Sequence, residues 1–116
     1  MNIFSLTTNK LVEHLKTGQI SSVEVCTQYI ERIEKFEKDI NAWEYFDKKK
    51  LLEKAEEADE HRKSGKPMGS LHGLPIAVKD IIGTFEMPTE CGTPLRKKCQ
   101  AHKILKLSIY LKLQEQ

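Results

Sequence analysis

The spacing of apolar residues predicts helices in the first part of the chain. One of the threonines at positions 7–8 can cap a first helix, and Gly18 can end it, because glycine tolerates the left-handed conformation found after a helix. Ser21 and Glu24 form an S-x-x-E capping box, so a second helix is expected to begin there and to end near residues 37–40. Its apolar residues recur every three or four positions: Val23, Val25, Cys26, Tyr29, Ile30, Ile33 and Phe36.

A third helix is predicted over residues 48–64, before a loop rich in glycine and proline at residues 65–70. Its narrow apolar face consists of Leu51, Leu52, Ala55 and Ala58. Its charged residues are interpreted as the solvated side of the helix. They are Glu53, Lys54, Glu56, Glu57, Asp59 and Glu60.

Three segments have the character of strands. Residues 42–46 are aromatic and bounded by polar residues, which favours a short strand. Residues 76–78 form a compact β-prone run of the kind that is buried on both sides in α/β sheets. Residues 105–113 alternate leucine or isoleucine with polar residues, which predicts a strand with one apolar face. Residues 81–94 contain two glycines and two prolines and are predicted to be an irregular loop.

Composition narrows the class of protein. The chain has 116 residues, of which 39% are hydrophobic and 31% charged, an ordinary globular balance for one domain or part of one. The net charge of +2 is small and mixed along the chain, which argues against a nucleic-acid partner. No apolar run approaches membrane-spanning length, and the first residues do not resemble a signal peptide, so a cytoplasmic location is expected.

The cysteines and histidines give no sign of a metal or a cofactor. The three cysteines form no C-x-x-C pair and are expected to be free thiols in a reducing compartment. The four histidines lack metal-ligand spacing. His72 is interpreted as a loop histidine that is hydrogen-bonded to the backbone, and no cofactor is expected.

Lys79 is the residue most suited to chemistry, because it follows an apolar run. Lysine is seldom buried without a partner, and a lysine forced into such a site can act as a base. The alternative is a surface lysine whose stem lies on apolar neighbours. Asp80 is interpreted as a structural hydrogen-bond acceptor rather than an acid catalyst.

Several strings around Lys79 resemble the amidase signature family. Leu-His-Gly-Leu-Pro-Ile-Ala-Val-Lys-Asp at residues 71–80 is similar to the family's stretch around its first catalytic lysine. Met-Pro-Thr-Glu-Cys-Gly-Thr-Pro at residues 87–94 also looks like that family. Upstream, Glu-Arg-Ile at residues 31–33 and Asn-Ala at residues 41–42 follow the same order. The resemblance covers roughly residues 5–95.

The resemblance implies an α/β fold with a mixed central sheet between helices. This chain would supply outer helices and the first one or two strands, and would be incomplete on its own. It also implies a Ser-cis-Ser-Lys site that hydrolyses a small amide substrate, in which only the lysine maps here, onto Lys79. The A subunit of glutamyl-tRNA amidotransferase shares much of the loop at residues 81–94, and in that setting a nucleic acid enters the reaction.

The sequence departs from the family after Pro94. Residues 1–95 are therefore predicted to be an amidase N-terminal segment, and residues 96–116 a divergent tail that either a frameshift or a short gene product would explain. The family's glycine- and serine-rich stretch is absent, so the chain alone is expected to be an inactive fragment. Its serines are interpreted as caps, turn residues or surface residues: Ser5, Ser21, Ser22, Ser64, Ser70 and Ser108.

An alternative function is a non-catalytic helical interaction module. In that case the second helix would present an apolar face to a partner. The face would consist of Val23, Cys26, Ile30 and Ile33.

Overall fold

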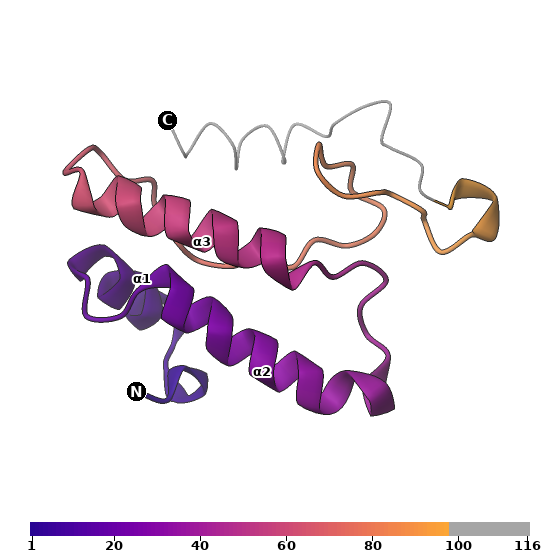
Figure 1. Ribbon diagram of the computed structural model, residues 1–116, viewed down its shortest axis with the longest axis horizontal. Coiled ribbons are helices and arrows are strands. Elements are labelled where there is room, and N and C mark those ends of the chain that lie inside the picture. Colours follow the sequence, from indigo (N-terminus) through magenta and orange to yellow (C-terminus); the bar gives the residue numbers. More distant parts are fainter. Residues whose placement is uncertain (98–116) are drawn as a thin grey trace. The chain divides into compact units, whose positions relative to one another are not determined.

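The computed structural model describes residues 1–97, which contain three α-helices (Figure 1). These are α1 (Thr8–Thr17), α2 (Ser22–Ile40) and α3 (Lys48–Lys63). Short 3-10 turns lie at Ile3–Ser5 and Pro94–Arg96. The chain divides into two compact units, one formed by residues 1–75 and one that begins at Ile76.

The helix ends follow the predicted caps. The Thr7 side chain accepts a hydrogen bond from the N–H of Lys10 at 3.4 Å, and Gly18 ends α1 with a φ of 76°. At the start of α2, the Glu24 N–H donates to Ser21 Oγ at 3.0 Å and the Ser21 N–H donates to Glu24 Oε2 at 2.8 Å. The capping box is thus confirmed, and it satisfies two N–H groups that have no partner within the helix.

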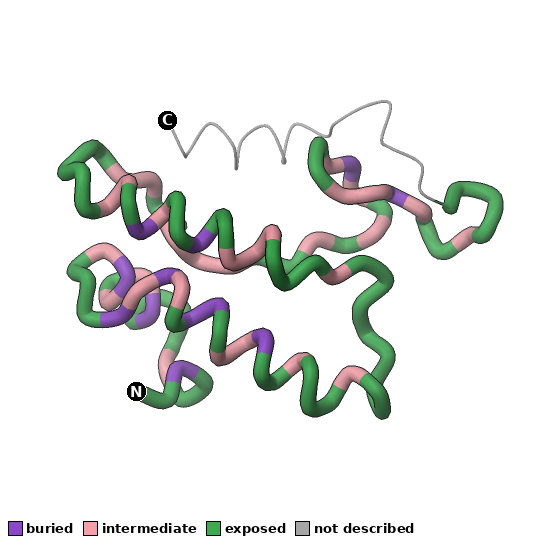
Figure 2. The backbone as a smooth tube through the Cα atoms, viewed as in Figure 1, coloured by how far each residue is buried: buried purple, intermediate pink, exposed green. Residues whose placement is uncertain are grey.

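The core of the first unit lies between the N-terminal turn, α1 and the start of α2. It consists of Ile3, Leu11, Leu15, Ile20 and Val25, with Leu6, Tyr29 and Leu74 packed against it. The tube in Figure 2 shows buried positions along these elements and exposed positions over most of the second half of α2. Each buried aliphatic side chain contributes about 1.5–3 kcal/mol relative to full exposure. α2 and α3 lie side by side and make the main helix–helix contact.

The prediction that Asp59 lies on the solvated side of α3 is wrong. Asp59 is buried, and its carboxylate accepts hydrogen bonds from the N–H groups of Ser22 at 2.9 Å and Val23 at 3.1 Å. α3 therefore caps the N-terminus of α2 with an acidic side chain, where the helix dipole favours negative charge. The periodicity of α3 alone carries no sign of this contact, because the partners are 36 and 37 residues away.

Neither predicted strand in the described part of the chain forms. Residues 42–46 lie in the connection between α2 and α3, which begins with Asn41 in the left-handed conformation. The Trp43 N–H donates to Glu37 Oε1 at 2.8 Å instead of to a neighbouring strand. Residues 76–78 have no strand pairing either, and Ile76 is 47% exposed. A strand needs a neighbour, and residues 1–97 supply none. The predicted strand at residues 105–113 lies outside the described residues.

Candidate lysine site

Lys79 lies at the start of a tight turn in the second unit. Its carbonyl accepts a hydrogen bond from the N–H of Ile82 at 2.9 Å, which closes the turn of residues 79–82. The Lys79 side chain is exposed. In this chain, then, Lys79 is not the buried lysine that an active base requires.

Asp80 anchors that turn to a later loop. Its Oδ1 accepts from the N–H of Glu90 at 2.8 Å and its Oδ2 from the N–H of Gly92 at 3.2 Å. Its backbone carbonyl accepts from the N–H of Cys91 at 3.1 Å. The interpretation of Asp80 as a structural acceptor is confirmed.

The first half of the segment 71–80 is held by α2 and α3. His72 Nε2 lies 2.8 Å from the carbonyl oxygen of Ala58, and the Ser22 hydroxyl donates to the carbonyl of Gly73 at 2.6 Å. Gly73 has a φ of 75°, a conformation that few other residues adopt. The interpretation of His72 as a backbone-bonded loop histidine is confirmed. Ser22 is a buried contact residue whose role depends on a residue 51 positions away, so sequence spacing did not reveal it.

The serine hydroxyls that the structure describes serve local structure. Ser5 donates to the Asn2 carbonyl, Ser64 donates to the His61 carbonyl, and Ser21 and Ser22 make the contacts described above. None of these four carries the hydrogen-bonded base that an activated nucleophile needs.

Two of the cysteines are described, and both are free. Burial raises the pKa of the Cys26 thiol to about 11, which keeps it protonated and unreactive at neutral pH. Cys91 is exposed, on the loop that contacts Asp80. Neither thiol is assigned a catalytic role.

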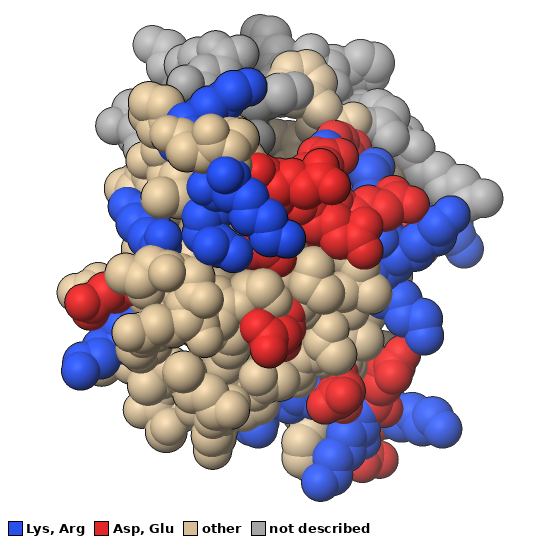
Figure 3. Space-filling view, turned by 60° about the vertical axis from the view of Figure 1, so that its left-hand side comes forward, with Lys and Arg blue, Asp and Glu red and all other residues tan. Residues whose placement is uncertain are grey.

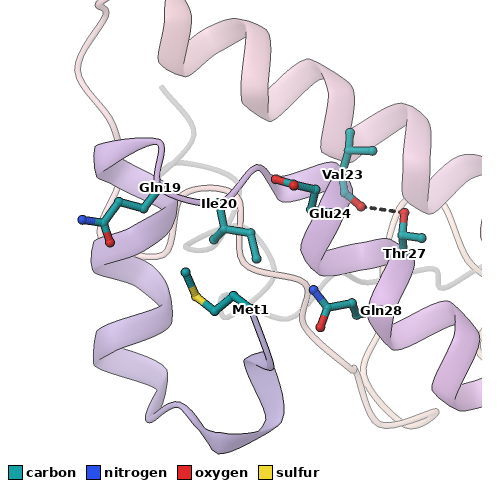
Figure 4. Close-up of a pocket in the computed structure, with 7 residues that line it drawn as sticks. All are labelled: Met1, Gln19, Ile20, Val23, Glu24, Thr27 and Gln28. Carbon is teal, nitrogen blue, oxygen red and sulfur yellow. Dashed lines mark hydrogen bonds between the residues drawn. The ribbon is translucent and has the colours of Figure 1, made fainter.

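A shallow cleft of about 330 Å³ lies between the N-terminus and the start of α2 (Figure 4). The carboxylate of Glu24 is already bonded to Ser21, and the Thr27 hydroxyl donates to the carbonyl of Val23 at 2.8 Å. This cleft therefore offers no nucleophile with an adjacent base. Its lining residues are Met1, Gln19, Ile20, Val23, Glu24, Thr27 and Gln28.

The charged side chains and helices narrow the kind of site further. On the face drawn in Figure 3, basic side chains lie beside acidic ones and form no continuous basic surface. Among residues 1–97, no three His, Cys, Asp or Glu side chains gather in a way that would hold a metal ion. No helix in that range is long and apolar enough to span a bilayer.

Comparison with known proteins gives this geometry a family. Residues 24–103 match the family model described as Amidase. The chain belongs to the amidase family. The match includes α2, α3, the turn at Lys79 and the loop that binds Asp80.

Several curated relatives carry the name of the A subunit of glutamyl-tRNA(Gln) amidotransferase. The protein from Leptospira interrogans is 38% identical over 86 residues, which cover 74% of this chain and 18% of the relative. The protein from Lachnospira eligens is 37% identical over 95 residues, which cover 82% of this chain and 20% of the relative. The chain thus spans about a fifth of the length of these relatives.

A solved structure shares the fold. It is an inhibitor-bound vestigial protein complex that bears on the evolutionary origins of an s-triazine catabolic enzyme. It aligns with a TM-score of 0.83 and 24% identity, over 95% of this chain and 24% of that chain. The fold of the N-terminal part of an amidase is therefore present, with its helices in place.

The apolar face of α2 does not serve as the predicted partner-binding face. Cys26 and Ile30 are 2% and 7% exposed, because residues of the same unit cover them. Val23 and Ile33 are half-buried. A helical interaction module would have to use a different surface.

Proposed function

We propose that the protein acts in the hydrolysis of an amide C–N bond and that Lys79 is the general base of its active site. The observation that carries this proposal is the amidase match across residues 24–103, which contains Lys79 in the string of residues 71–80. Hydrogen bonds from Ser22 and His72 hold the beginning of this string, and the bonds to Asp80 hold its end. A base must be held in place to abstract a proton efficiently.

In the proposed reaction, the neutral amine of Lys79 takes a proton from a bridging serine. That serine takes the proton of a nucleophilic serine, which attacks the amide carbonyl and forms an acyl-enzyme that water later hydrolyses. Backbone N–H groups stabilise the oxyanion formed in each step. None of the 116 residues lies in a glycine- and serine-rich segment able to supply these groups, so they must come from other parts of the amidase fold.

The exposure of Lys79 indicates what the rest of the fold adds. Water stabilises the protonated amine, so an exposed lysine is mostly charged at neutral pH and is a poor base. We propose that residues 76–78 join a mixed sheet in the complete α/β fold and that this sheet covers Lys79. Residues 1–95 would then be the N-terminal amidase segment, and residues 96–116 a tail that departs from it.

The substrate class follows from the same proposal. The substrate is a small amide, and the names of the relatives place such chemistry in amide transfer to glutamyl-tRNA(Gln) by an assembly with more than one kind of chain. A cytoplasmic setting fits that chemistry.

The 116-residue chain by itself is predicted to be inactive. The purified chain and its Lys79→Ala variant would be assayed for ammonia release from simple aliphatic and aromatic amides. Neither should exceed the buffer rate. Turnover that disappears in Lys79→Ala would contradict the claim that the nucleophile is missing.

The role of Lys79 requires a complete amidase. Residues 24–103 would replace the corresponding segment of the Leptospira interrogans relative, and the chimera would be compared with its Lys79→Ala and Lys66→Ala variants. Lys66 is an exposed lysine in the loop after α3, which makes it a matched control. General-base removal typically costs about 10²–10⁴-fold in rate.

A further inference from the structure

Two segments of the second unit meet at the carboxylate of Asp80. One is the turn of residues 79–82, and the other is the loop of residues 89–92. Three N–H groups of the loop, at Glu90, Cys91 and Gly92, donate to Asp80. Two of these bonds reach the side chain and one reaches the backbone carbonyl.

The backbone of the loop is shaped for an anion. Cys91 and Gly92 have φ values of 55° and 67°, both in the left-handed region. Successive residues in such conformations turn their N–H groups toward one side and form a concave anion-binding nest. Here the anion is the carboxylate of Asp80, which is held through both of its oxygens. Thr89, at the start of the loop, is 4% exposed and fixes the loop in the second unit.

The geometry points to Asp80 as the residue that positions Lys79. We infer that Asp80, bound in the nest of residues 89–92, fixes the turn of residues 79–82 and thereby the direction in which the Lys79 amine is presented. This inference rests on the proposed function, because the direction of the amine matters only if Lys79 is the base. Asp80 is adjacent to Lys79 in the chain, so any rotation of the Asp80 backbone moves the lysine with it.

The first experiment measures local order by NMR in the 116-residue chain, with Asp80→Asn and the control Asp39→Asn. Asp39 is an exposed acidic residue on α2. An asparagine retains one acceptor but directs an NH₂ group at a backbone N–H, so the nest should open. We expect hydrogen exchange at Glu90 and Gly92 to become roughly tenfold faster or more in Asp80→Asn. The ¹⁵N heteronuclear NOE of Lys79 should fall at the same time, while resonances of residues 1–75 stay unchanged.

A purely structural role would produce a different pattern. If Asp80→Asn unfolds residues 1–75 as well, or leaves the order of Lys79 as in the parent, the inference is wrong. It is also wrong if the Glu90 and Gly92 amides of the parent chain already exchange without protection. Asp39→Asn should change none of these signals.

The second experiment measures activity in the chimera described above. Asp80→Asn should lower kcat by roughly tenfold or more with little change in KM, because substrate binding does not use the turn. Full activity in Asp80→Asn, together with an inactive Lys79→Ala, would overturn the inference and leave the proposed function intact. Full activity in Lys79→Ala would overturn the proposed function, and the NMR result would still report whether Asp80 anchors the turn.

Discussion

The contact between Asp59 and the N-terminus of α2 allows a stability prediction for Asp59→Ala. The carboxylate accepts two backbone N–H groups, at 2.9 and 3.1 Å, and its side chain is 11% exposed. A hydrogen bond to a charged group contributes about 1.5–3 kcal/mol, so the loss of both would cost about 3–6 kcal/mol. An open cleft of about 300 Å³ borders Asp59 and admits water to the freed N–H groups. The lower end of that range, about 3 kcal/mol, is therefore expected.

The assay is urea denaturation followed by circular dichroism at 222 nm. With a slope of about 1.5 kcal/mol/M, a loss of about 3 kcal/mol lowers the midpoint by about 2 M. Asp59→Asn keeps one acceptor and should lose roughly half as much. The control is Glu56→Ala, an exposed position on the same helix, which should stay within about 0.5 kcal/mol of the parent.

The reasoning is refuted if Asp59→Ala and Glu56→Ala have the same midpoint. That result would mean that water replaces the carboxylate without loss and that α3 does not cap α2 energetically. A smaller slope in Asp59→Ala would point instead to a change in the unfolded state.

Three further predictions concern single groups. In Gly18→Ala, the added Cβ would lie 2.5 Å from Arg62 Nη1 at a φ of 76°, so a loss of more than about 1–2 kcal/mol is expected. Gly65→Ala has a φ of 73° and no neighbour within 4 Å, so it should lose less, and equal denaturation midpoints would rule out the Arg62 contact. Iodoacetamide at pH 8 should label Cys91 and spare Cys26, whose pKa is raised to about 11, and mass spectrometry that finds equal labelling would contradict the burial of Cys26. The backbone and side-chain hydrogen bonds of Ser21 hold the pKa of the Glu24 carboxyl below its usual 4.5, so the stabilisation by the capping box should be complete above pH 4.5 and lost as the pH falls through the lower folded value. Glu24→Gln should remove this part of the acid dependence, and an unchanged pH profile of the urea midpoint would count against the box.

The helices could be predicted because their signals are local. Ser21 and Glu24 are three residues apart, and their mutual hydrogen bonds fix the start of α2 whatever else surrounds it. Gly18 and Asn41 end the first two helices through their own backbone conformations. No distant partner is needed for either signal.

The contacts that hold the site together could not be predicted in this way. Asp59 and Ser22 bond to residues far along the chain, and a charged residue on a helix looks the same whether it faces water or a neighbouring helix end. The aromatic residues 42–46 suggested a strand, yet strand formation depends on a neighbour that residues 1–97 do not provide. Lys79 was found through the string around it, while the anchoring of Asp80 by residues 90–92 became visible only in the structure.

The central claim is that Lys79 is the base of an amidase site. The most direct test is the ratio of kcat/KM for ammonia release between the Lys66→Ala and Lys79→Ala variants of the chimera with the Leptospira interrogans relative. A ratio of about 10²–10⁴ is predicted, with Lys66→Ala equal to the parent chimera. A ratio near one, in a chimera that hydrolyses amides, would contradict the assignment of Lys79.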